Sequence, residues 1–229
     1  MTKLGIIGAM DVEVETLLAE MEQVTSAKKA GSTFHEGVLM GLPVVLVQCG
    51  VGKVNAAVCA QTMALIYEPE LIINSGVSGA LSPELRVGDV VIGTDVVQHD
   101  VDTTALGDEP GFVSTVDRLS FPLDNFASTA IAAAAEELGI HAVRGRIASG
   151  DQFISSAERK DAIVKTFGAI ACEMEGAAIG QVCYVNRVPF CVLRAISDSA
   201  DGSSHMDYPT FVGMAAEQSV KLLRTFLKN

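Results

Sequence analysis

Short, almost continuously apolar runs recur along this chain of 229 residues, and segments with helical periodicity separate them. Strands buried on both faces have this continuous apolar pattern, whereas strands with one wet face alternate apolar and polar residues. The alternation of such strands with helices predicts an α/β sandwich around a largely parallel sheet. A hairpin expected over residues 33–40 and 43–48, turning at Gly41, makes the predicted sheet mixed. The other main strands are expected at residues 4–7, 71–73, 89–97, 143–148 and 190–196.

Helical periodicity and stop signals place the helices between these strands. The expected helices cover residues 11 to about 22, 53–67, 125–138 behind an Asp124 cap, 157–167, a segment ending near Asn186, and 208–227. Residues 74–80 are small and are expected to form a loop. Residues 99–122 form the least regular stretch, which is long for a plain connection and therefore suggests a functional or interface loop.

Acidic residues follow several of the apolar runs. In the stretch Ala171-Cys172-Glu173-Met174-Glu175-Gly176 a short strand leads directly into a helix, and two carboxylates stand at the junction. By themselves they are equally well explained as acids at a helix N-terminus. Glu13 and Asp198 also follow apolar runs, however, and the carboxyl ends of parallel strands share one edge of a sheet, where ligands bind. The sequence thus predicts a cleft that contains Glu13, Glu175 and Asp198.

The composition limits the partners and the compartment. Apolar residues make up 49% of the chain, and no apolar run reaches the roughly 18 residues of a membrane span. The net charge of −12 disfavours nucleic acid and anionic membranes as partners. Five cysteines without metal-ligand spacing are expected to be core thiols in a reducing compartment. Acidic residues directly after the first apolar run argue against a signal peptide, so a cytoplasmic location is expected.

Other motif interpretations have less support. Gly5-Ile6-Ile7-Gly8-Ala9-Met10 lacks the G-x-G-x-x-G spacing of a dinucleotide site, and Gly50-Val51-Gly52-Lys53-Val54 lacks the final Ser or Thr of a P-loop. His99-Asp100-Val101-Asp102 has no second histidine cluster that would complete a metal site. No G-x-S-x-G motif marks a serine hydrolase.

Four motifs, in order, resemble those of the bacterial 5′-methylthioadenosine/S-adenosylhomocysteine nucleosidases. They are Gly5-Ile6-Ile7-Gly8-Ala9-Met10, Ser149-Gly150-Asp151-Gln152-Phe153-Ile154, Cys172-Glu173-Met174-Glu175-Gly176-Ala177-Ala178 and Arg194-Ala195-Ile196-Ser197-Asp198. The resemblance spans almost the whole chain. It implies a three-layer α/β/α sandwich with a central mixed, partly barrel-like sheet, a single nucleosidase domain over residues 1–229, and neither a cofactor nor a metal.

The resemblance also implies hydrolysis of the N-glycosidic bond of 5′-methylthioadenosine and S-adenosylhomocysteine, and also of 5′-deoxyadenosine. The reaction would pass through a ribosyl cation, as in glycosidases. Asp198 matches the acid that protonates N7 of adenine, and Ser197 would steady its carboxyl group. Glu13 matches the residue that activates the attacking water, with Arg194 close by.

Further residues are expected to bind the substrate. Glu175 would accept hydrogen bonds from the ribose hydroxyls, Met174 would pack on the sugar, and Glu173 would either touch the ribose or support Glu175. Phe153 would stack on adenine, the Ile154 backbone would bind its edge, and Val77, Ser78 and Gly79 would line the base and sugar. The apolar slot for the 5′ group is expected from Met10, Val51, Tyr208 and Phe211, closed by Thr103 and Leu106 of the partner subunit in a homodimer.

Four other functions compete with this interpretation. A nucleoside phosphorylase needs arginines for its phosphate, and residues 1–85 contain none, so water is the expected nucleophile. A futalosine or aminodeoxyfutalosine hydrolase shares the chemistry and remains the principal alternative. A non-catalytic adenosine-binding module would not need both Glu13 and Asp198. A signalling receiver domain is excluded by the chain length and the additional strand-end loops.

Overall fold

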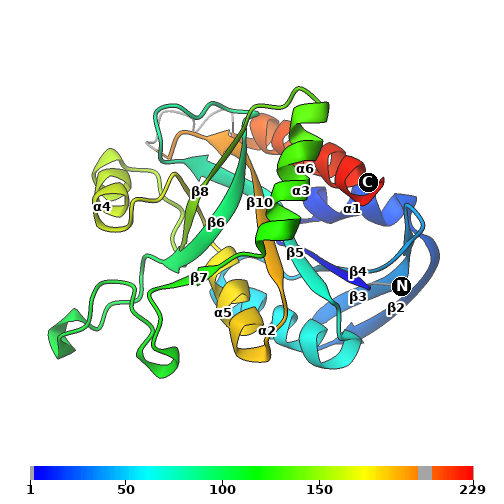
Figure 1. Cartoon of the computed structure of the whole chain (residues 1–229), viewed down its shortest axis with the longest axis horizontal. Coiled ribbons are helices and arrows are strands. Elements are labelled where there is room, and N and C mark those ends of the chain that lie inside the picture. Colours follow the sequence, from blue (N-terminus) through cyan, green and yellow to red (C-terminus); the bar gives the residue numbers. More distant parts are fainter. Residues whose placement is uncertain (1–2, 201–207, 229) are drawn as a thin grey trace.

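The computed structural model describes residues 3–200 and 208–228, the side chains of residues 208–210 excepted. Strands and helices alternate along most of this length, as the sequence predicts (Figure 1). The strands are β1 (Leu4–Gly8), β2 (Glu22–Lys29), β3 (Ser32–Leu39), β4 (Leu42–Gln48), β5 (Leu71–Ala80), β6 (Val90–Gln98), β7 (Ser120–Pro122), β8 (Ala142–Ser149), β9 (Ala171–Glu173) and β10 (Phe190–Asp198). The helices are α1 (Asp11–Glu20), α2 (Lys53–Thr62), α3 (Asn125–Glu137), α4 (Ala157–Phe167), α5 (Gly176–Asn186) and α6 (Tyr208–Lys228).

The strands form one mixed sheet that closes partly on itself. Its order is β10-β6-β8-β9-β5-β1-β4-β3-β2, and an additional pairing of β10 with β5 closes a ring of five strands. The strands β1, β4, β3 and β2 extend from this ring as an open wing. The prediction of an α/β fold around a mixed, partly barrel-like sheet is confirmed.

Helices cover the sheet in two groups. Helix α6 packs against both α1 and α3, while α2 and α5 form a second pair. Figure 1 shows α5 and α2 apart from α1, α3 and α6, with strands between the two groups. The interior is apolar, and it includes all five cysteines as free, buried thiols, as expected.

Two expectations about the strands were wrong. Residues 74–80 form the second half of β5 rather than a loop, because their backbone pairs with β10 from Asn74 to Gly79. Small residues are needed there: a Cβ atom on Gly76 would lie 2.7 Å from Oε1 of Glu13. Strand β2 was not predicted, because all eight of its side chains are exposed and leave no apolar pattern.

Helix boundaries differ from the prediction by small amounts. Helix α1 ends at Glu20 rather than near Glu22, and residues 63–67 continue α2 as a π-helical turn. Asp124 caps α3 as expected, since its side chain accepts a hydrogen bond from the Ala127 amide at 2.8 Å.

The long connection after β6 contains two short 3-10 turns, Thr104–Leu106 and Ser114–Val116. In Figure 1 this green segment projects from the body of the molecule at the lower left. Leu106 is 84% exposed at one of its tips.

Candidate active site

A cleft with an empty volume of about 540 Å³ lies beyond the ends of the central strands. Its walls come from the junction of β1 with α1, the segment before α2, the end of β5, the segments after β8 and β9, and the end of β10. The lining residues are Ala9, Met10, Glu13, Val51, Val77, Ser78, Gly79, Gln152, Phe153, Ile154, Cys172, Glu173, Met174, Glu175, Ser197 and Asp198. The prediction that Glu13, Glu175 and Asp198 share one cleft is confirmed.

Glu13 is held by backbone amides of the β1–α1 junction and of β5. Its Oε2 accepts hydrogen bonds from the amides of Ala9 at 2.6 Å and Met10 at 2.9 Å, and its Oε1 accepts one from Val77 at 3.2 Å. Burial raises the pKa of Glu13, whereas the positive charge of Arg194 and these backbone amides oppose the rise. A carboxyl group with a raised pKa is suited to proton transfer near neutral pH.

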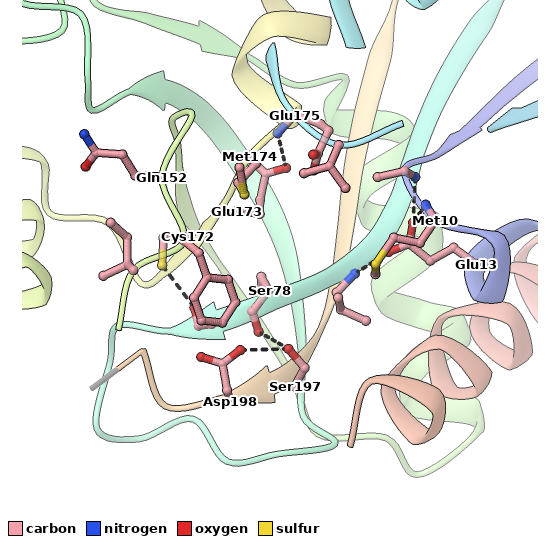
Figure 2. Close-up of a pocket in the computed structure, with 16 residues that line it drawn as sticks. Met10, Glu13, Ser78, Gln152, Cys172, Glu173, Met174, Glu175, Ser197 and Asp198 are labelled. Atoms are coloured by element: carbon pink, nitrogen blue, oxygen red, sulfur yellow. Dashed lines mark hydrogen bonds between the residues drawn. The ribbon is translucent and has the colours of Figure 1, made fainter. Parts of the chain in front are cut away.

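Glu175 occupies the opposite wall, next to Met174 (Figure 2). Its Oε1 accepts a hydrogen bond of 2.8 Å from the amide of Gly52. Burial, together with the negative charge of Glu173, raises the pKa of Glu175 to about 7. A ligand that donates hydrogen bonds would therefore stabilise the ionised form of this buried carboxyl group.

The negative charge of Glu173 is stabilised by more donors than that of Glu175. Its Oε2 accepts hydrogen bonds from the amides of Glu175 and Gly176 and forms an ion pair of 2.5 Å with Arg194, and its Oε1 accepts the Ser149 hydroxyl. Burial alone would raise the pKa of Glu173, but Arg194 and these donors hold it below its ordinary value. These contacts favour the ionised form of Glu173, whose carboxylate also binds the backbone amide of Glu175.

Arg194 does not line the cleft, although it was expected beside the reacting groups. Its side chain is 2% exposed and lies behind the cleft, between Glu173 and Asn74. Its charge reaches Glu13 by proximity, because Nη1 of Arg194 and Oε1 of Glu13 both border Gly76. In the empty cleft Arg194 therefore acts as a buried counter-charge to the carboxylates.

Asp198 and Ser197 form the third wall, at the end of β10. Oδ2 of Asp198 accepts the Ser197 hydroxyl at 2.9 Å, and Oδ1 accepts the Ala200 amide at 2.8 Å (Figure 2). A Cβ atom on Gly79 would lie 2.9 Å from Oδ1, so a glycine there gives the carboxyl group its space. These contacts fix the orientation of a carboxyl group that faces the cleft.

The structure gathers most of the predicted site residues and adds three. Ala9, Gln152 and Cys172 line the cleft without having been predicted as site residues, although all three stand within the quoted motifs. Phe211 is half-buried and does not line the cleft, and the Tyr208 side chain lies outside the described residues. Thr103 and Leu106 lie on the projecting loop, away from the cleft of their own chain, in keeping with their expected role in a partner subunit.

The charged side chains that line the cleft are all acidic. Among the described lining residues are four carboxylates and no lysine or arginine. Within the described part of the chain, no three His, Cys, Asp or Glu side chains are grouped so as to hold a metal ion. The cleft suits a neutral ligand that donates hydrogen bonds, or a reaction that develops positive charge.

A mixed sheet that closes partly into a barrel, with an acidic cleft beyond its strand ends, defines the class of nucleoside phosphorylases and nucleosidases. The chain belongs to the phosphorylase superfamily, whose family model matches residues 3–228. It is 41% identical to a 5′-methylthioadenosine/S-adenosylhomocysteine nucleosidase of Haemophilus ducreyi, over 99% of this chain and 98% of that protein.

Two solved structures are also close. The nucleosidase of the same description from Neisseria meningitidis, in complex with methylthio-immucillin-A, superposes with a TM-score of 0.95 at 38% identity, covering 100% of this chain and 99% of that one. The futalosine hydrolase of Helicobacter pylori strain 26695 superposes with a TM-score of 0.94 at 34% identity, covering 98% of this chain and 97% of that one.

Proposed function

We propose that this chain hydrolyses the N-glycosidic bond of 5′-methylthioadenosine and S-adenosylhomocysteine, releasing adenine and the 5′-thioribose. The observation that carries this proposal is the convergence of Glu13, Glu175 and Asp198 in one cleft without a cationic lining residue. The 41% identity to a nucleosidase of this specificity over 99% of the chain supports it. No helix in the described ranges has the length and apolar character to cross a membrane.

Asp198 supplies the proton to the leaving base in this proposal. The bond to adenine breaks more readily when N7 is protonated, because the base then leaves as a neutral molecule. Ser197 and the Ala200 amide hold the Asp198 carboxyl group in a fixed direction. A positioned acid of this kind contributes about 10²–10⁴ in rate.

Glu13 orients and deprotonates the attacking water. Three backbone amides fix its two oxygens, so the carboxylate is in place before the substrate arrives. As the ribosyl cation develops, the four carboxylates of the cleft wall also stabilise its positive charge.

Glu175 binds the ribose hydroxyls, and Glu173 supports it from behind. The oxygens of Glu173 already accept from Arg194, Ser149 and two backbone amides. Glu175 accepts only the Gly52 amide among the described hydrogen bonds, which leaves it free to accept from the sugar. In this proposal Glu173 supports Glu175 and does not itself bind the ribose.

The remaining walls hold the two ends of the nucleoside. Phe153 and the Ile154 backbone would hold adenine, with Val77, Ser78 and Gly79 beneath it, near Asp198. Met10 and Val51 line the same cleft near Glu13 and offer an apolar surface to the 5′ substituent.

Water, rather than phosphate, is the nucleophile that the cleft favours. Phosphorolysis requires cationic donors around a dianion, and the lining set contains none among the described residues. A futalosine-type hydrolase remains the second candidate, because such an enzyme superposes with a TM-score of 0.94. Side-by-side kinetics with methylthioadenosine, S-adenosylhomocysteine, 5′-deoxyadenosine and aminodeoxyfutalosine separate the two candidates: a kcat/KM highest for aminodeoxyfutalosine would overturn the first.

A homodimer is part of this proposal. An apolar face on α2, the following π-helical turn and α5 carries the exposed side chains Val54, Val58, Leu65, Ile66 and Val185. This face continues to Val51 at the cleft, so a second copy seated there would bring its projecting loop, with Thr103 and Leu106, to the 5′ slot. Light scattering of wild type and of Leu65→Glu tests the dimer, and a wild-type monomer would refute it.

The location and domain organisation follow as further proposals. Five free, buried thiols are typical of a protein of the reducing cytoplasm. A single domain over residues 1–229 is supported by one sheet that all the described strands share.

A further inference from the structure

A ring of polar contacts lies outside the cleft and joins three separate segments of the chain. The backbone amide of Lys53 donates to Oδ1 of Asp151 at 2.7 Å, and the amide of Asp151 donates to Oδ2 of Asp100 at 2.8 Å. The Lys53 ammonium closes the ring with an ion pair of 2.6 Å to Oδ1 of Asp100. None of these three residues lines the cleft.

Each segment in the ring leads directly into a functional part of the site. Lys53 follows Gly52, whose amide binds Glu175, and Val51, which lines the cleft. Asp151 precedes the segment 152–154, which forms the wall expected to hold the base. Asp100 stands at the base of the projecting loop, two residues after β6 ends at Gln98.

The central pair of the ring is largely withdrawn from water. The side chains of Lys53 and Asp100 are 18% and 14% exposed, and the ammonium also donates to Oε1 of Gln98 at 3.0 Å. Burial opposes ionisation of Asp100, but the donors from Lys53 and Asp151 hold its pKa below the ordinary value. A charge pair in such a setting fixes geometry, because loss of one partner leaves the other poorly solvated.

The ring also supplies the missing cap of α2. Gly52 stands at the N-cap with φ of 97° and has no side chain to cap the helix, so Asp151 performs this function from a distant part of the sequence. A Cβ atom on Gly52 would lie 3.0 Å from Oδ1 of Asp151. The orientation of the Gly52 amide toward Glu175 therefore depends on where Asp151, and through it Asp100, is held.

We propose that Asp100 is a positioning residue, which acts through Asp151 and Lys53 to hold the Gly52 amide against Glu175 and so fixes the sugar-binding carboxylate. This inference rests on the proposed function, since it assumes that Glu175 binds the ribose. Through these contacts the base of the projecting loop is connected to the Gly52 segment beside Glu175 and to the segment 152–154 that is expected to hold the base.

The test compares Asp100→Asn and Lys53→Met with wild type, using methylthioadenosine as substrate. Asp95→Asn is the matched control. Asp95, on β6, is also a part-buried carboxylate, and it forms an ion pair of 2.6 Å with Arg146 of β8. We expect kcat/KM to fall by about ten- to a hundredfold in both ring variants and to stay within about twofold of wild type in the control. Lys53→Arg, which keeps the charge, should restore most of the activity.

The pH profile separates positioning from the purely electrostatic effect of removing the Asp100 charge. The Gly52 hydrogen bond lowers the pKa of Glu175, while Glu173 and Glu13 raise it and Arg194 lowers it. Loosening the Gly52 amide should move the acid limb of kcat/KM to higher pH in Asp100→Asn. Removal of a negative charge alone would move the limb to lower pH, so the direction is diagnostic.

Each outcome bears on one claim. If wild type releases no adenine, the proposed function fails. If wild type is active and a folded Asp100→Asn matches it in rate and pH profile, the positioning role is overturned while the function stands. If Asp100→Asn does not fold, Lys53→Met decides: wild-type kinetics in that variant contradict the proposal, and a reduced kcat/KM that Lys53→Arg recovers supports it.

Discussion

Burial of the ionised Glu175 side chain destabilises the folded protein, and replacing Glu175 with glutamine should raise the free energy of unfolding measured without substrate. The side chain is 6% exposed, and burial together with Glu173 raises its pKa from 4.5 to about 7. A group with a raised pKa in the folded state favours folding below its unfolded pKa and loses that contribution as pH rises through the folded value. The window therefore runs from about pH 4.5 to about pH 7.

The size of the expected stabilisation follows from the pKa shift of Glu175. At about 1.4 kcal/mol per pKa unit, the rise to about 7 corresponds to about 3 kcal/mol. Glutamine carries no charge and can still accept the Gly52 amide, so it avoids this cost. Relative to wild type, Glu175→Gln should gain up to about 3 kcal/mol in free energy of unfolding between pH 4.5 and pH 8.

Urea unfolding of both proteins across this range measures the difference. Glu13 also has a raised pKa, but it is present in both proteins and its contribution largely cancels. A difference in unfolding free energy that stays constant with pH would refute the reasoning. Such a result would mean that Glu175 is solvated or paired in the folded protein.

The remaining predictions concern catalysis and the buried ion pair. Glu13→Gln should keep the fold and lose about 10²–10⁴ in kcat, measured by adenine release; near-normal turnover would remove Glu13 as the base. Glu173→Gln should lower the unfolding free energy by about 3–5 kcal/mol, because it leaves the Arg194 charge without its partner; urea unfolding at pH 8 checks this, and an unchanged midpoint would contradict the counter-charge role. The kcat/KM of wild type should fall as pH drops below about 7, as Glu175 becomes protonated and accepts fewer hydrogen bonds from ribose; a profile flat from pH 5 to 8 would contradict this.

The central part of the site could be predicted because its residues stand at strand ends. Glu13, Glu175 and Asp198 each follow a run of apolar residues. Strands β1 and β10 both run parallel to β5, which brings Glu13 and Asp198 to one edge of the sheet. Strand β9, which precedes Glu175, pairs antiparallel with β5, so the parallel arrangement alone does not account for the position of Glu175. The fold class followed from the same runs. The resemblance of four motifs then gave each carboxylate a specific role.

Other features left no readable signal. Arg194 stands in a strand whose nine residues are all buried, so no alternation shows which way the side chain points. The small residues 74–80 look like a loop, and only the pairing with β10 makes them a strand. The ring of Lys53, Asp100 and Asp151 joins residues 47 to 98 positions apart, and such contacts depend on the tertiary fold.

The identity of the sugar product tests the central claim most directly. Incubation of the protein with methylthioadenosine in excess inorganic phosphate, followed by mass spectrometry of the products, distinguishes the two nucleophiles. Water as the nucleophile yields adenine and free methylthioribose, with adenine also released at the same rate when phosphate is omitted. Formation of methylthioribose 1-phosphate, or adenine release that requires phosphate, would contradict the hydrolytic mechanism.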